Sequence, residues 1–208
     1  SLNLVYTLRP GVFLRGSASM TVARPEFREL APFQFTDFFG GETVQGNPAL
    51  QRTRIVNTDA RFEWFFGPID LVAVSVFYKH FDQPIETVIQ GGADIIRSFA
   101  NAKSAYTLGA ELELRKELVF AGEGPRGFSL GGNLTLLQSR VDLSQTAGAQ
   151  TDPNRPMQGQ SPFVVNLFAE YERPDWGTGL RLLYNVFGER IDSVGASGQP
   201  NRWEQPRH

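Results

Sequence analysis

Cysteine is absent from this sequence of 208 residues, and methionine and histidine occur only twice each. Without cysteine the chain has no disulfide, no thiol nucleophile and no thiolate metal site. The two histidines, His80 and His208, are far apart in the sequence, and neither lies beside another histidine, so no histidine metal site is expected. The composition therefore gives no reason to expect a metal or another cofactor.

Long apolar runs and a strong net charge are also missing. No stretch of about 18 apolar residues occurs, so no membrane-spanning helix is predicted, and the first residues lack the basic and apolar segments of a signal peptide. The formal net charge is −2, so no electrostatic argument favours nucleic acid as a partner. The chain starts inside an expected strand, and we therefore expect an internal piece of a longer protein.

The chain does contain a regular alternation of apolar and polar side chains. Between Phe128 and Leu136 the even positions are apolar or glycine, and the odd positions are polar or glycine. This period of two residues is typical of β-strands and recurs about eight times. Several segments exceed about ten residues, which is unusual in soluble sheets and suits strands that cross a bilayer. We expect strands near residues 2–8, 12–23, 53–66, 70–81, 103–119, 127–143, 161–173 and 178–191, and a loop over 192–208.

The connections between these strands alternate between short and long. The short ones contain Gly and Pro, which permit tight reversals, and they fall at 9–11, 67–69, 122–125 and 174–177. Outer-membrane barrels sort their connections in this way, with short periplasmic turns and long extracellular loops. The predicted fold class is therefore all-β: an antiparallel up-and-down meander of about eight long strands, forming a partial segment of a transmembrane β-barrel.

The two faces of the expected sheet differ in polarity. We expect a lipid-facing side made of aliphatic residues, namely Val72, Val74, Leu108, Leu112, Leu134, Leu136, Val165, Leu180 and Leu182. We expect a lumen-facing side that carries charge, namely Asp59, Arg61, Glu63, Glu111, Glu113, Arg115 and Arg181. Charges at every second position cannot line the dry core of a β-sandwich. They suit a wide lumen that is filled with water or closed by a plug.

Several local strings, taken in order, resemble the barrel of TonB-dependent outer-membrane receptors. The strings include TVARPEFRELAPF at 21–33, GNPAL at 46–50, NRP at 154–156, QGQSP at 158–162 and YNVFG at 184–188. The resemblance covers nearly the whole chain. It implies a 22-stranded barrel around an N-terminal plug, of which residues 1–208 form part of the single barrel domain, without the plug and the final strands.

The same resemblance implies a function and a location. It implies active uptake of a scarce solute, such as a siderophore, cobalamin or a glycan, across the outer membrane of a Gram-negative bacterium. The implied partners are the outer-membrane lipid, the plug, the TonB energy-coupling complex acting through the plug, and a small solute. A passive porin-like or secretion barrel is the alternative that the strand pattern permits, and a soluble β-sheet module is a third class.

Catalysis finds no support in the sequence, and an enzyme is not expected. Glu111 and Glu113 stand two residues apart on one face, but Arg115 follows them, so a lumen salt-bridge ladder is the better interpretation than a catalytic carboxylate pair. The serines have no partner base at an informative spacing.

Solute binding is expected on the long connections, because binding residues concentrate on loops held by a rigid scaffold. The candidates are Arg24, Glu26, Arg28, Arg155 and Gln158. For each of them a self-packed loop is the competing interpretation.

Overall fold

A computed structural model describes residues 1–36, 43–90, 96–119, 127–144, 146, 151–195 and 198–206. Eight long strands form one sheet in the order β1-β2-β5-β6-β9-β10-β12-β13. Their bounds are Leu2–Arg9 (β1), Val12–Ala23 (β2), Thr53–Phe65 (β5), Leu71–Asp82 (β6), Ser104–Val119 (β9), Gly127–Asp142 (β10), Phe163–Arg173 (β12) and Thr178–Phe187 (β13). Every neighbouring pair of these strands is antiparallel. The predicted antiparallel meander is therefore confirmed.

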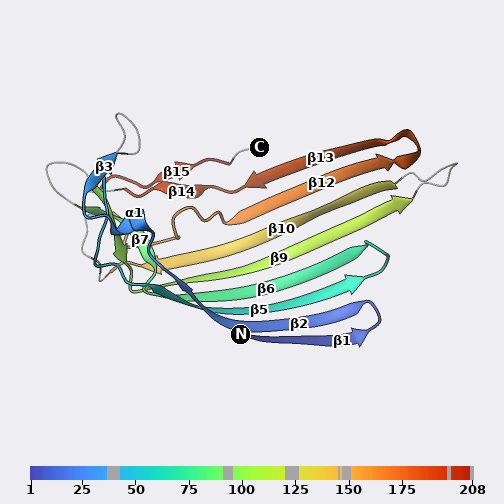
Figure 1. Ribbon diagram of the computed structural model, residues 1–208, viewed down its shortest axis with the longest axis horizontal. Helices are drawn as coiled ribbons and strands as arrows, with labels where there is room; N and C mark the ends of the chain where they lie inside the picture. Colours follow the sequence, from blue (N-terminus) through green and yellow to red (C-terminus); the bar gives the residue numbers. More distant parts are fainter. Residues whose placement is uncertain are drawn as a thin grey trace.

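The sheet is curved and open, with β1 and β13 at its two edges (Figure 1). We call these eight strands the wall. Eight strands are too few to close a barrel of the size that holds a plug, which agrees with the expectation of a partial segment. Among the described residues, no helix is both long enough and apolar enough to span a membrane.

The short turns that the structure describes gather at one end of the wall, and they reverse the chain within a few residues (Figure 1). At the first turn Gly11 has φ +77, and the Phe65 amide donates to the Gly11 carbonyl over 2.7 Å. A β-carbon at Gly11 would lie 2.6 Å from the Phe65 carbonyl oxygen, so only glycine fits there. The last turn contains a 3-10 helix, Pro174–Trp176 (η1), and the expected turn at 122–125 lies outside the described residues.

The long connections gather at the other end, and we call the structure they form the rim (Figure 1). The rim contains one short helix, Phe27–Leu30 (α1), and seven short strands: Gln34–Thr36 (β3), Thr43–Gln45 (β4), Ile85–Gln90 (β7), Ile96–Asn101 (β8), Asn154–Arg155 (β11), Arg190–Ser193 (β14) and Arg202–Glu204 (β15). Four of these strands pair in the order β3-β4-β8-β7, with β4 and β8 parallel, and β11 pairs with the end of β10.

The sequence-based expectation was wrong for the tail. Residues 192–208 were expected to be a loop, but β14 and β15 form an antiparallel hairpin that includes Asp192 and Ser193. The reason is length, because strands of three to six residues are too short to show a reliable period of two. The two strands pair only with each other in the sheet, and the Ile191 carbonyl accepts a hydrogen bond from the Gly159 amide of another connection, which the local sequence does not reveal.

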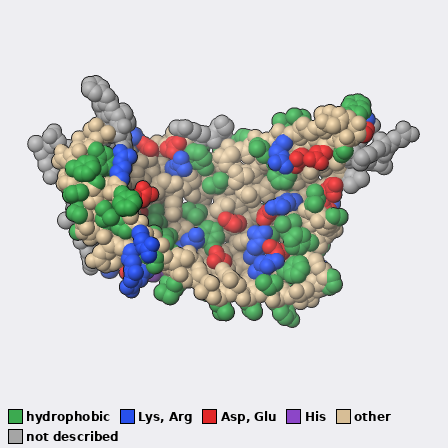
Figure 2. All heavy atoms as spheres, viewed as in Figure 1, with side chains coloured by type: hydrophobic (Ala, Val, Ile, Leu, Met, Phe, Trp, Pro, Cys, Tyr) green, Lys and Arg blue, Asp and Glu red, His purple; other side chains and the backbone are tan. Residues whose placement is uncertain are grey.

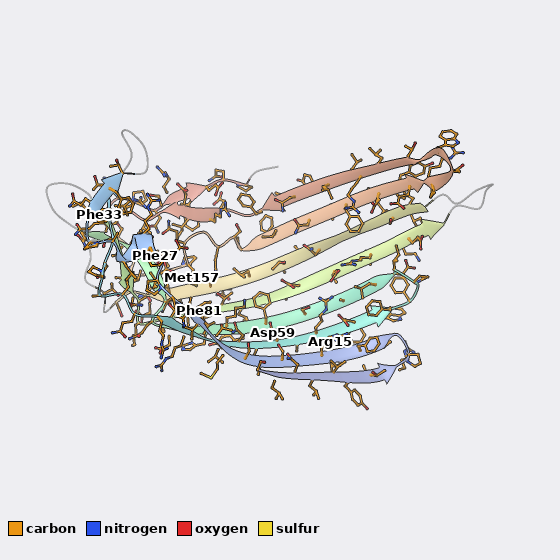
Figure 3. All side chains as sticks on the ribbon, in the orientation of Figure 1. Arg15, Phe27, Phe33, Asp59, Phe81 and Met157 are labelled. Atoms are coloured by element: carbon orange, nitrogen blue, oxygen red, sulfur yellow. The ribbon has the colours of Figure 1, made fainter. Side chains whose placement is uncertain are left out.

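An apolar core joins the rim to the wall. Val88 of β7 packs with Ala105 of β9, Val141 of β10 and Leu143, all nearly without exposed surface. Phe81 and Met157 pack against the edge of this cluster, at the junction seen in Figure 3. Burying these side chains stabilises the rim by about 1.5–3 kcal/mol for each large residue. The rim is therefore a packed structure that stands on the wall.

Candidate functional site

The strand register assigns each side chain of the wall to one of two faces. Residues directly paired across neighbouring strands point to the same side of a sheet. Val74, Leu112 and Leu134 pair in one such row. The same face carries all the other aliphatic residues predicted to face lipid, and most of these aliphatic side chains are largely exposed. A sheet face of exposed leucines and valines is what a bilayer-contacting surface requires.

The opposite face carries a chain of ion pairs that crosses the wall. Arg15 of β2 contacts Glu63 of β5 over 2.8 Å, and Glu63 also contacts Arg61 over 2.8 Å. Arg61 Nη2 lies 2.7 Å from Glu113 Oε2 on β9, and Arg115 lies 2.7 Å from the other Glu113 oxygen. Figure 2 shows acidic and basic side chains gathered over the middle of the face of the sheet that is in view. Opposite charges therefore alternate along one continuous polar surface.

The ion-pair chain passes over β6 because that strand has small side chains at this level. Ala73 pairs with Glu63 on one side and with Glu113 on the other, and it has no exposed surface. Its neighbour on the same face, Ser75, accepts a hydrogen bond from Arg61 Nη1 over 3.0 Å. The small side chain at position 73 thus leaves room for the Arg61 guanidinium to extend over β6 and to reach Glu113 on β9.

The remaining residues predicted to face the lumen lie on the same polar face. Asp59 accepts a hydrogen bond from the Ser17 hydroxyl over 3.0 Å, and Arg181 contacts Glu170 over 2.8 Å. Glu111 pairs in register with Ser75 and Thr135. Together with Asp59, Arg61, Phe77 and Lys79, it borders a shallow hollow of about 300 Å³.

Three asparagines extend this polar face toward the last strand. Asn166 donates to Asn133 over 2.7 Å, and Asn185 donates to Asn166 over 2.6 Å. They stand in the same row as Glu113, so each amide lies beside the next across β10, β12 and β13. The polar face therefore runs from β2 to β13, as a surface that contacts water or another polar body requires.

Glu113 is held by two arginines, Arg61 and Arg115, whereas Glu111 pairs in register with Ser75 and Thr135. In the part of the chain that the structure describes, no group of three or more His, Asp and Glu residues could hold a metal ion.

The rim brings three of the solute-binding candidates to its exposed surface. Arg24, Glu26 and Arg28 lie in or beside α1, and each is exposed. Phe27 lies between them with 96% of its surface exposed, and Figure 3 shows it at the rim together with Phe33. The Arg28 guanidinium lies 4.3 Å from the centre of the Phe35 ring. An exposed cluster of cations and rings is suited to binding an anionic, aromatic molecule.

The other two candidates have structural contacts instead. Arg155 is fully buried, lies 2.9 Å from Glu86 Oε2, and donates to the carbonyls of Thr87 and Pro156. Gln158 Nε2 donates to the Asp192 carbonyl over 2.7 Å. In this arrangement the Arg155 side chain has no surface with which to contact a solute.

Glu86 is the rim residue that the sequence did not single out. Burial raises the pKa of its carboxyl above the ordinary value, and the nearby Arg155 and the Gln158 amide oppose that effect. The available signal was a single acidic residue within the apolar run Ile85–Ile89, which indicates a partner for a buried charge. The identity of that partner was hidden, because it lies on a different connection.

Comparisons with known proteins agree with this geometry. The family model of the TonB dependent receptor-like β-barrel matches residues 1–207. Among solved structures, a point mutant of the ferric enterobactin receptor PfeA from Pseudomonas aeruginosa, in complex with enterobactin, is similar with a TM-score of 0.64 and 16% identity. The siderophore receptor PirA from Acinetobacter baumannii is similar with a TM-score of 0.61 and 14% identity.

The matches to these solved structures cover nearly all of this chain but only part of each receptor. Both alignments cover 99% of this chain, but only 31% of the PfeA chain and 32% of the PirA chain. The chain thus spans about a third of the length of these receptors. A search of the curated proteins found no match. The family match over almost the entire chain is decisive, and the protein belongs to the TonB-dependent receptor β-barrel family.

Proposed function

We propose that residues 1–208 form part of the barrel domain of an outer-membrane receptor that takes up a scarce small solute actively. Barrels of this family are outer-membrane proteins of Gram-negative bacteria, and the family consists of transporters and receptors. The observation that carries the proposal is the contrast between the two faces of the wall. One face is aliphatic and exposed, and the other holds the ion-pair chain from Arg15 to Arg115.

The polar face is proposed to contact the plug. The positive and negative side chains of this face are paired with one another within the wall. The face therefore has a low net charge toward the body that fills the lumen. Such a surface suits another protein surface with polar side chains better than it suits a selective ion pore, which needs a ring of one sign. The plug would in turn bind the TonB complex. The aliphatic face is proposed to contact outer-membrane lipid.

The rim is proposed to capture the solute, and no residue of this chain is proposed to act as a catalyst. Arg24, Arg28 and the exposed Phe27 form the proposed contact surface, with Glu26 beside them. The solute class supported first is a ferric siderophore, because the similar structures include two siderophore receptors.

A passive channel, the alternative function, would not require a packed rim. A porin or secretion barrel has no need of a packed rim with its own apolar core, whereas Val88, Val141 and Leu143 form such a core here. We therefore favour the receptor.

Binding by the intact receptor tests the proposal. We would measure the affinity for ferric enterobactin and for other ferric siderophores by quenching of intrinsic fluorescence. The double variant Arg24→Ala/Arg28→Ala is expected to weaken binding by about tenfold or more, since two charge-assisted contacts are lost. The matched control is Arg9→Ala, an exposed arginine at the short-turn end of β1. Unchanged binding in the double variant, or equal loss in the control, would contradict the proposed capture surface.

A further inference from the structure

Two long connections of the rim meet at one buried ion pair. Glu86 belongs to the β7–β8 hairpin and Arg155 to the connection that follows β10. Their side chains are 6% and 0% exposed, and Arg155 Nη2 lies 2.9 Å from Glu86 Oε2. Glu86 shares one face of the hairpin with Val88, which is part of the apolar core, so the pair lies beside that core.

Arg155 is fixed to the wall at its backbone and to the hairpin at its side chain. Its backbone pairs with Val141 at the end of β10, and the neighbouring Leu143 amide donates to the Pro153 carbonyl over 2.8 Å. Its guanidinium also donates to the Thr87 carbonyl over 3.3 Å. The residue therefore connects a rigid strand of the wall to the β7–β8 hairpin.

The tail hairpin contacts both the β7–β8 hairpin and the segment that contains Arg155, so each of the three segments contacts the other two. The Gly159 amide and the Gln158 side chain donate to the carbonyls of Ile191 and Asp192, which joins the 154–160 segment to β14. Arg97 of β8 donates to the Ser193 hydroxyl, which joins the β7–β8 hairpin to β14. We call the three joined segments, strands β7 and β8 (85–90 and 96–101), residues 154–160 and residues 190–195, the rim triangle. Each side of the triangle is a direct contact.

The Glu86–Arg155 side differs from the other ion pairs of the rim in its burial. Arg202 and Asp192 form an exposed pair at 2.7 Å, with the arginine side chain 70% exposed. Exposed pairs contribute little to stability, whereas removing one partner of a buried pair leaves a group without compensation in a medium of low dielectric constant. The triangle therefore depends on Arg155 far more than on Arg202.

The triangle is also incompletely satisfied. In the described part of the chain, Arg155 Nε and Gln158 Oε1 are buried side-chain atoms without a hydrogen-bond partner. Each of these atoms gains hydrogen bonds to water when the segments separate. The closed triangle is thus held by one buried ion pair, and two polar atoms beside that pair gain hydrogen bonds when the segments separate, which favours opening of the segments as a unit.

We infer that Glu86 and Arg155 are positioning residues that hold the rim triangle as one body, so that its three segments open and close together. The consequence for solute capture rests on the proposed function: the triangle supports the capture surface through Asn47, whose backbone amide donates to the Glu29 carbonyl of α1 and whose side-chain amide donates to the Phe99 carbonyl of β8. Neither Glu86 nor Arg155 contacts the solute in this account.

Hydrogen exchange of the intact receptor tests the coupling. Arg155→Met keeps most of the side-chain volume but removes the charge and the contacts to Glu86 and Thr87. It is expected to speed amide exchange in all three segments together by about tenfold or more, with the central wall strands unchanged. Arg155→Lys keeps the charge and should give a smaller increase. The matched control, Arg202→Met, should leave all three segments unchanged.

Two results would overturn the inference. One is faster exchange confined to residues 154–160, because the segments would then open independently. The other is coupled loosening with an unchanged affinity for a ferric siderophore that the unmodified receptor binds, because the pair would then have no positioning role. If the unmodified receptor binds no ferric siderophore, the proposed solute is wrong, and the exchange pattern alone decides whether the triangle moves as one body.

Discussion

Arg61 on β5 reaches across β6 and contacts Glu113 on β9, with 2.7 Å between Nη2 and Oε2. The contact joins two strands that are not neighbours in the sheet, and it is possible because Ala73 lies between them. Hydrogen bonds of the backbone fix each strand to the next, whereas this side-chain contact fixes the spacing over three strands. It gives the wall a stiff polar surface on the side proposed to hold the plug.

Removing Arg61 should destabilise the wall. In Arg61→Met, Glu63 and Glu113 each lose a partner while both remain mostly buried, which is expected to cost about 1–3 kcal/mol in the free energy of unfolding. Urea unfolding of the intact receptor in liposomes measures this cost. Arg115→Met is the control, because that arginine is 56% exposed at the end of the ion-pair chain and should cost less. An equal loss in the free energy of unfolding in both variants would show that the Arg61–Glu113 contact across β6 stabilises the wall no more than the exposed Arg115 contact does.

Two neighbouring positions on β10 test the assignment of faces. Leu134 stands on the aliphatic face and Thr135 on the polar face. Leu134→Arg should lower barrel stability by about 2–4 kcal/mol if residue 134 lies near the middle of the bilayer, and Thr135→Arg should lower it much less. The same unfolding measurement in liposomes compares them. Similar losses at both positions would refute the assignment.

The first turn should not tolerate a side chain at Gly11. Gly11→Ala combines a positive φ with a β-carbon that would lie 2.6 Å from a backbone oxygen, so a cost of about 1–3 kcal/mol is expected. Gly127→Ala provides the comparison, because a β-carbon there meets no atom within 4 Å. Thermal unfolding of both variants in detergent gives the difference. A Gly11→Ala receptor as stable as Gly127→Ala would disprove the need for glycine at this turn.

Opening of the rim should depend on pH through Glu86. Its pKa is raised in the closed rim, mainly by burial, so the closed rim binds a proton more readily than the open rim. The contribution of Glu86 to the closed rim is therefore complete below its ordinary pKa of 4.5 and is lost as the pH rises through the raised value. Exchange in residues 85–90 and 96–101, corrected for the intrinsic pH effect, should become faster over that interval. Glu86→Gln should remove the dependence, and its persistence in that variant would assign it to another group.

The sequence predicted the wall well and the rim poorly, for a physical reason. Strands such as β9 and β10 alternate apolar and polar residues over 16 residues each. The local sequence is therefore enough to predict both the strand and the face on which each side chain lies. The short strands β7 and β14 hold together through contacts with distant segments. Arg155 was predicted to contact the solute, but a charged residue on a long connection can either bind a ligand or pack within its own loop. The choice between them depends on Glu86, whose position in space no local pattern encodes.

Energy-dependent uptake by whole cells tests the central claim most directly. Cells that produce the intact receptor would be given a radiolabelled ferric siderophore to which the purified receptor binds, with and without a functional TonB complex. We expect accumulation only when TonB is present, and we expect surface binding to persist when TonB is removed, because capture by the rim precedes transport. Equal accumulation in both strains would contradict active uptake and would support the passive channel instead.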